Sequence, residues 1–283
     1  MKKCILFTNC QGYGILRALL TVERFRQEYE FQEVPNYIPT AKEVIQKGIK
    51  EADLIIYQPT HNKERSIFIT DELLQYRKPD AIVLSFPYIY CNWLWPFYMN
   101  QTLIAMNHSA TVFYDNGVIR QLYTEGGGRK GVAGILKHYE NQQIDFGLKK
   151  RRDESLRILR EREATMDIKV ADYILANYKT KLLFKIANHP THYLLIHCAN
   201  QILEKLGFTD CVIGEETDIG EYNDHKQWPI CEYAKNVLEL EYPFHPSSGH
   251  FYNSLLRDVL SNLQDSYPIN NPYFNYVLPP CER

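Results

Sequence analysis

Near its start the chain runs from an apolar stretch into a polar turn, Cys4-Ile5-Leu6-Phe7-Thr8-Asn9-Cys10-Gln11-Gly12. Consecutive apolar residues that end at polar ones are typical of a buried strand. Behind the turn, apolar residues recur at helical spacing, at Ile15, Leu16, Leu19, Leu20 and Phe25. The segment therefore predicts a strand, a tight turn and a helix, which together form a β-turn-α unit.

The same alternation continues along the first half of the chain. A helix is expected from about Thr40, with Thr40 as its N-cap and Glu43 three residues on, to Ala52. Strands are expected at residues 53–57 and 81–84, where short apolar runs end at polar residues or proline. Strands that alternate with helices indicate an α/β protein of three layers, α/β/α, with a mainly parallel sheet.

Alternation resumes in the second half of the chain. A helix is expected over residues 168–178 and a short strand over 182–184. His189 and Pro190 then lead into a helix that Gly207 ends. Because proline favours the first position of a helix, His189 is expected to be the N-cap or its neighbour.

We expect one domain over residues 1–283, with a helical insertion. The insertion is expected over residues 126–170, whose composition differs from that of the rest of the chain. The segment begins with a glycine-rich loop and continues into a highly charged helix over about 149–162. Residues 240–283 are rich in Tyr, Pro and Asn, and they are expected to wrap the domain as irregular chain around one helix at about 251–263.

Composition and charge exclude several classes of protein. The chain has 283 residues, 45% of them hydrophobic, and a formal net charge of −2, so nothing predicts a nucleic-acid partner. No apolar run approaches the roughly 18 residues of a membrane span, and the N-terminal run is too short for a signal peptide, which predicts a cytoplasmic protein. The 7 cysteines are scattered without a C-x-x-C pair, so neither a disulfide framework nor a metal site is expected.

Polar residues follow the predicted strands. Ligands of parallel α/β sheets bind outside the carboxyl ends of the strands, so these residues are the candidates for the site. They come from three separate segments: Asn9, Cys10, Gln11 and Gly12; Gln58; Asn188 and His189. We expect Cys10 and His189 to react and Gln11 to assist them, with Asn9, Gly12, Gln58 and Asn188 as oxyanion donors or orienting groups.

Two of these positions suit catalysis. Cys10 lies between the first strand and a helix expected to begin near Gly14, where unpaired N–H groups and the helix dipole favour a thiolate and predict a nucleophile. The same dipole would lower the imidazolium pKa of His189 and make it a general base. Packed residues without a catalytic role are the alternatives, as they are for His192 and His197. His245 and His250 are further candidates for the base.

A basic glycine-rich segment offers a place for phosphate. Gly126-Gly127-Gly128-Arg129-Lys130 could hold an anion through backbone N–H groups and the cations of Arg129 and Lys130. The alternative is an ordinary solvated loop. No P-loop or dinucleotide-binding motif occurs in the chain.

Three of these segments carry a resemblance to a known family. Thr8-Asn9-Cys10-Gln11, Tyr57-Gln58-Pro59 and Asn188-His189-Pro190-Thr191 resemble the WcbI family of capsular polysaccharide biosynthesis enzymes, over residues 1 to about 210. The resemblance implies a divergent SGNH-hydrolase-like or flavodoxin-like α/β fold, coenzyme A binding and acetylation of a sugar. It places Cys10 where those hydrolases have their serine, and His189 and Pro190 on the family's His-Pro motif.

The chain departs from the wider hydrolase pattern at one position. Ile186 stands three residues before His189, where those hydrolases carry an aspartate. The resemblance therefore implies a Cys/His dyad with neutral orienting groups. A neutral orienter stabilises an imidazolium less than a carboxylate does.

The leading hypothesis is an acetyltransferase that uses acetyl-CoA and a sugar or polysaccharide precursor, without a metal. Either Cys10 forms a thioester, or His189 activates the acceptor hydroxyl directly. Two alternatives stay open: an esterase or deacetylase of the same fold, with water as acceptor, and a non-catalytic protein that binds CoA or carbohydrate.

Overall fold

The computed structural model describes residues 1–38, 40–60, 70–95, 147–220, 230 and 232–243. Its contacts divide the chain into two units, residues 1–91 with 156–227, and residues 92–155 with 228–283. The first unit contains all the strands described below. The expectation of a single domain over 1–283 stays a prediction.

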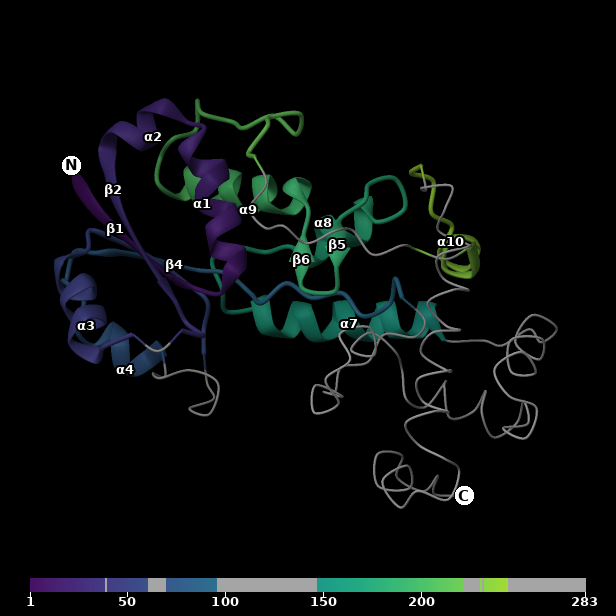
Figure 1. The fold of residues 1–283 in the computed structure, drawn as a ribbon, viewed down its shortest axis with the longest axis horizontal. Coiled ribbons are helices and arrows are strands. Elements are labelled where there is room, and N and C mark those ends of the chain that lie inside the picture. The colour runs from purple at the N-terminus through teal and green to yellow at the C-terminus, as the bar shows by residue number, and fades with distance from the viewer. Residues whose placement is uncertain (39, 61–69, 96–146, 221–229, 231, 244–283) are drawn as a thin grey trace, which may run out of the picture. The chain divides into compact units, whose positions relative to one another are not determined.

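A four-stranded parallel sheet forms the centre of the first unit (Figure 1). Its strands are β1 (Lys2–Thr8), β2 (Tyr29–Pro35), β3 (Leu54–Tyr57) and β4 (Ile82–Ser85), in the order β2-β1-β3-β4. The chain leaves β1 toward one edge and then crosses to its other side, so the strand order reverses between β1 and β3. Such a switch point is where open α/β sheets bind ligands.

Helices cover both faces of the sheet, which confirms the predicted α/β/α architecture. On one face α3 (Lys42–Glu51) and α4 (Thr70–Leu74) bury Ile45, Ile49 and Leu73 against Ile5 and Ile55. On the other, α1 (Cys10–Leu20) packs along α9 (His192–Lys205). Successive strand residues point to opposite faces, so a strand buried on both faces is apolar throughout.

Three details differ from the sequence-based expectations. The helix after β1 ends at Leu20, and Phe25 belongs to a separate α2 (Glu23–Glu28). The N-cap of α3 is Ala41 rather than Thr40, because the Thr40 hydroxyl donates to the Ile38 carbonyl instead. The strand β2 was not expected, since its sequence Tyr-Glu-Phe-Gln-Glu-Val-Pro alternates in polarity, as an edge strand does.

The strand expected at 182–184 is not part of the parallel sheet. It lies slightly later, as β5 (Phe184–Ile186), and pairs antiparallel with β6 (His189–Pro190) in a separate hairpin. The hairpin follows α8 (Ala171–Asn177), which falls within the helix expected over 168–178. It leads directly into α9, whose burial of Leu195, Ala199 and Ile202 matches the predicted apolar face.

The charged helix is present as α7 (Leu148–Glu163), and a further helix, α10, spans Glu232–Leu238. That residues 126–170 are an insertion stays a prediction, and residues 126–146 lie outside the described residues. So does almost all of the predicted C-terminal wrap, including the helix expected at 251–263. Across the described residues, no helix is both long and apolar enough to cross a membrane.

Candidate active site

Cys10 is the first residue of α1, so the helix begins earlier than the start near Gly14 that the sequence suggests. The preceding residue, Asn9, is the N-cap, and its side-chain oxygen accepts a hydrogen bond from the Gln11 N–H at 2.9 Å. This cap uses the oxygen of the Asn9 amide, which leaves the amide nitrogen as the atom that can donate to a ligand. The strand β1 and the cap together fix the position of the Cys10 sulfur.

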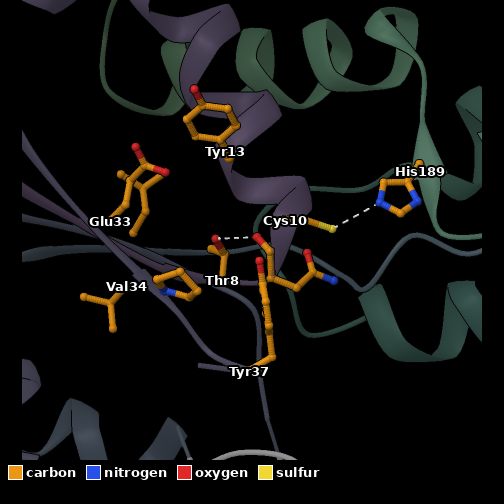
Figure 2. A pocket seen from close by; sticks show the side chains of 10 residues that line it. Thr8, Cys10, Tyr13, Glu33, Val34, Tyr37 and His189 are labelled. Carbon is orange, nitrogen blue, oxygen red and sulfur yellow. Dashed lines mark hydrogen bonds between the residues drawn. The ribbon is translucent and has the colours of Figure 1, made fainter. Parts of the chain in front are cut away.

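His189 faces this sulfur. The Cys10 Sγ and the His189 Nε2 lie 3.6 Å apart, and Figure 2 shows the two side chains directed at each other. The imidazole is 6% exposed, so water has little access to it. The sequence placed these residues at one edge of the fold; the structure brings them within hydrogen-bonding distance across 179 positions of the chain.

The local structure around His189 differs from the expectation. His189 and Pro190 form β6, and the N-cap of α9 is Thr191, so His189 lies outside the first turn of the helix. The helix-dipole argument therefore does not apply to this imidazole. Its placement comes from the β5–β6 pairing, in which Ile186 is the strand partner of His189. Ile186, which stands where the hydrolases have an aspartate, is thus a buried residue that pairs with His189 in the hairpin.

The environment of the thiol also corrects an expectation. Burial raises the pKa of the Cys10 thiol, while the backbone N–H groups of Cys10 and Gln11 oppose that shift. The net direction is upward, because loss of water penalises the thiolate more than two N–H groups stabilise it. Cys10 is therefore a thiol at rest, and the nearby imidazole has to take its proton when it reacts.

This direction predicts the pH dependence of Cys10 alkylation by iodoacetamide. Only the thiolate reacts, so the rate should rise with pH, and its midpoint should lie above about 8.5, the ordinary thiol value. Peptide mass spectrometry should follow the Cys10 peptide, because other thiols react as well. A midpoint below about 7 would contradict a raised pKa. It would show instead that Cys10 is a thiolate near neutral pH, as the helix start alone suggests.

Gln11 is buried and does not face the sulfur. Its Nε2 donates to the carbonyls of Ile89 at 2.6 Å and Asn188 at 2.9 Å, and its Oε1 accepts from the Ile89 N–H at 3.1 Å. Asn188 contacts this network through its main chain. Gln11 therefore connects the start of α1 to the residue before His189 and to the chain after β4, which supports a positioning role.

Gln58 completes the same buried network. Its Oε1 accepts from the Asn9 N–H at 2.8 Å, and its Nε2 donates to the Gln11 Oε1 at 3.0 Å and to the Pro87 carbonyl at 3.3 Å. The amide thus joins the ends of β1, β3 and β4. Gln58 supports the turn that holds Cys10, and the imidazole is not among these partners.

Gln11→Ala should lower the free energy of unfolding by about 2–4 kcal/mol, because it leaves buried amide groups without partners. Urea denaturation measures the change. Gln27→Ala is the matched control, since Gln27 lies on the surface and bonds only to Glu23 through its Nε2. Equal changes in the two variants would show that the Gln11 network contributes nothing to stability.

Gly12 is required by packing rather than by a ligand. A Cβ at this position would lie 2.5 Å from the Thr8 Cβ and 1.9 Å from the Thr8 Oγ1. The N–H of Gly12 donates to the Asn9 carbonyl at 3.1 Å, so it is engaged in the turn. The role of Gly12 as an oxyanion donor stays a prediction that its hydrogen bonding does not favour.

A cavity of about 350 Å³ opens beside Cys10 and His189 (Figure 2). This volume falls in the range of small-molecule sites, roughly 300–1,000 Å³. Its lining residues come from β1, α1, β2, the chain after β2, and β6: Leu6, Thr8, Asn9, Cys10, Tyr13, Glu33, Val34, Pro35, Tyr37 and His189. The sequence identified three of them as site residues, Asn9, Cys10 and His189.

The other candidates fall elsewhere. His197 bonds the Lys169 carbonyl through Nε2 at 3.1 Å and stacks on Tyr173, which is a structural role. His192 lines a second cavity of about 370 Å³, beside Glu215. Burial lowers the pKa of both histidines.

Four candidates lie outside the described residues: Arg129, Lys130, His245 and His250. Within the described ranges, no group of three or more His, Cys, Asp or Glu side chains could hold a metal ion. Cys4, Cys91 and Cys198 are buried as free thiols.

Comparison with known proteins identifies the family of the chain. A model of the family described as "Polysaccharide biosynthesis enzyme WcbI" matches residues 3–211, which include both Cys10 and His189. The chain belongs to the WcbI family. WcbI proteins are described as polysaccharide biosynthesis enzymes, so the Cys10–His189 pair lies in a chain of that enzyme class.

A solved WcbI structure has the same fold. It is described as a novel polysaccharide biosynthesis enzyme, in its native form without a disulfide bond between CoA and one of its cysteines. It shares 18% identity with this chain at a TM-score of 0.57, and the match covers 97% of each chain. No curated protein matches the chain.

Proposed function

We propose that the chain is an acetyltransferase that moves the acetyl group of acetyl-CoA to a hydroxyl of a sugar or polysaccharide precursor. The observation that carries the proposal is the 3.6 Å contact between the Cys10 sulfur and the His189 imidazole, at the switch point of a parallel sheet. A thiol and a base at this distance form the pair that covalent acyl transfer needs.

The first half-reaction loads the acetyl group onto Cys10. His189 Nε2 takes the proton of the Cys10 thiol as the sulfur attacks the thioester carbonyl of acetyl-CoA. The carbon–sulfur bond to CoA then breaks, and the imidazolium returns the proton to the leaving CoA thiolate. One thioester replaces another, so the enzyme holds the acetyl group at nearly the energy of the donor.

The second half-reaction transfers the acetyl group from Cys10 to the acceptor. The acceptor hydroxyl gives its proton to His189 Nε2 and attacks the Cys10 thioester, and the proton returns to the Cys10 sulfur as the ester leaves. The negative oxygen formed in each attack lies at the start of α1, where the Cys10 N–H and the Asn9 amide nitrogen can donate to it. His189 therefore moves one proton in each half, that of the Cys10 thiol in the first and that of the acceptor hydroxyl in the second.

The donor is supported by the WcbI relative, whose description names CoA and a cysteine together. We infer CoA binding by this chain from that description and from the position of Cys10. Arg129 and Lys130 remain our candidates for holding its phosphates. If they do, reversing both charges should weaken CoA binding more than acceptor binding.

Ligand-induced stabilisation tests the donor. A ligand that binds the native state raises the free energy of unfolding, by about 2.7 kcal/mol at 100 times its Kd, and therefore raises the unfolding temperature. CoA and acetyl-CoA should both produce a shift, and acetyl-CoA without an acceptor should leave an acetyl group on the Cys10 peptide. An unchanged unfolding temperature at high CoA concentration would exclude acetyl-CoA as the donor. Rapid release of acetate without an acceptor would favour the esterase instead.

A further inference from the structure

The cavity beside Cys10 has an outer wall of three side chains that the acyl-transfer steps do not use. Tyr13 comes from α1, Glu33 from the carboxyl end of β2, and Tyr37 from the chain just after β2. Figure 2 shows them spread around Cys10 on the side away from His189. We call Tyr13, Glu33 and Tyr37 the outer wall.

The two tyrosines present open aromatic surface. Tyr13 is 40% exposed and Tyr37 is 58% exposed, although a large aromatic side chain gains free energy by burial. Arg17 supports Tyr13, because its guanidinium lies 5.8 Å from the ring centre and donates to the hydroxyl at 3.4 Å. Flat aromatic faces with polar tips suit a ligand that has an apolar face and hydroxyl groups at its edge.

Glu33 gives the wall its charge. Among the described residues that line the cavity, it is the single carboxylate, and none is a lysine or arginine. An ionised carboxylate accepts hydrogen bonds and donates none, so it recognises hydroxyl groups and repels phosphate. Partial burial raises the pKa of this carboxyl, although the residue as a whole is exposed at the edge of the cavity.

We propose that the outer wall is the acceptor subsite and that it selects an uncharged, hydroxyl-bearing acceptor, with Glu33 accepting a hydrogen bond from the acceptor. This inference rests on the proposed acetyl transfer and names the chemistry of its acceptor. The wall excludes a phosphate close to the reacting hydroxyl. It follows that the phosphates of CoA bind outside this cavity.

The position of Tyr37 supports the proposal. Tyr37 lines the same cavity as Cys10. A ligand that contacts Tyr37 is therefore near the atom that carries the acetyl group. The wall and the nucleophile belong to one cavity.

The charge of the wall is testable without the natural acceptor. Iodoacetamide is neutral and iodoacetate is an anion, and both alkylate the Cys10 thiolate. The ratio of their rates at one pH cancels the thiolate fraction and reports the field at the sulfur. Glu33→Gln should raise the iodoacetate-to-iodoacetamide ratio about two- to fivefold, and this increase should shrink in about 1 M salt.

Two variants control this measurement. Glu30→Gln removes a carboxylate from the same strand at a residue that does not line the cavity, so its ratio should stay at the wild-type value. Glu33→Asp keeps the charge and should also stay near wild type. An unchanged ratio in Glu33→Gln, or equal changes in Glu33→Gln and Glu30→Gln, would overturn the proposal.

Acceptor choice is measured with glycerol and glycerol 3-phosphate as probes, in the presence of acetyl-CoA. The wild-type enzyme should acetylate glycerol in preference to glycerol 3-phosphate, and Glu33→Gln should narrow that preference. If the Cys10 thioester never forms, the proposed acetyl transfer is wrong. The alkylation ratio still shows whether Glu33 places a negative charge near the Cys10 sulfur. If the thioester forms and glycerol 3-phosphate is used as well as glycerol, or neither is used, the acceptor subsite is wrong.

Discussion

Cys10→Ala should lower the rate of acetyl transfer by on the order of 10⁴-fold or more, because it removes the atom that carries the acetyl group. The fold should survive, since the loss of one sulfur from a half-buried position leaves little empty volume. Transfer is measured as CoA released in the presence of acceptor, and folding as the urea midpoint.

Cys211→Ala is the matched control, because Cys211 is another partly exposed free thiol and does not line the cavity. It should retain the wild-type rate. Cys10→Ser should be slow as well, since an alcohol is a much weaker acid than a thiol. Full activity of Cys10→Ser would contradict attack by a thiolate.

His189→Gln should lower the rate by about 10²- to 10⁴-fold, the usual contribution of a positioned general base. Glutamine has a similar reach and forms hydrogen bonds, but it cannot take up the proton of Cys10. CoA binding should persist, so the rate and the affinity separate. The acidic limb of the pH–rate profile should disappear in this variant, because the imidazole must be neutral to act as base.

His192→Gln is its control, since His192 lies three residues later in the chain and lines the second cavity. It should keep both the rate and the acidic limb. If His189→Gln kept the wild-type rate, or if His245→Gln alone removed the acidic limb, another histidine would be the base.

The sequence predicts the centre of the fold because strands buried on both faces are apolar throughout. Apolar runs mark β1, β3 and also β4, an edge strand with Ile82 exposed, and the polar residues after the first two give Asn9, Cys10 and Gln58. Rules for parallel sheets then place these residues together without any coordinates. Cys10 is found this way, since a cysteine in a polar turn before a helix is unusual for a packed residue.

Other features depend on contacts that periodicity does not report. The edge strand β2 alternates in polarity and was missed, and with it Glu33 and Tyr37, which border the cavity. The Pro190 signal predicted a helix start, but pairing with Ile186 placed His189 in a strand. Burial raises the pKa of the Cys10 thiol, against the direction expected from the helix start.

Rapid quenching shows whether Cys10 carries the acetyl group. The enzyme is mixed with acetyl-CoA in the absence of acceptor, quenched in acid within milliseconds to seconds, and analysed by peptide mass spectrometry. We expect an acetyl thioester on the Cys10 peptide that forms with the release of CoA, forms more slowly in His189→Gln, and disappears when an acceptor is added. Acetyl transfer to an acceptor with no thioester on Cys10 at any time would contradict this expectation.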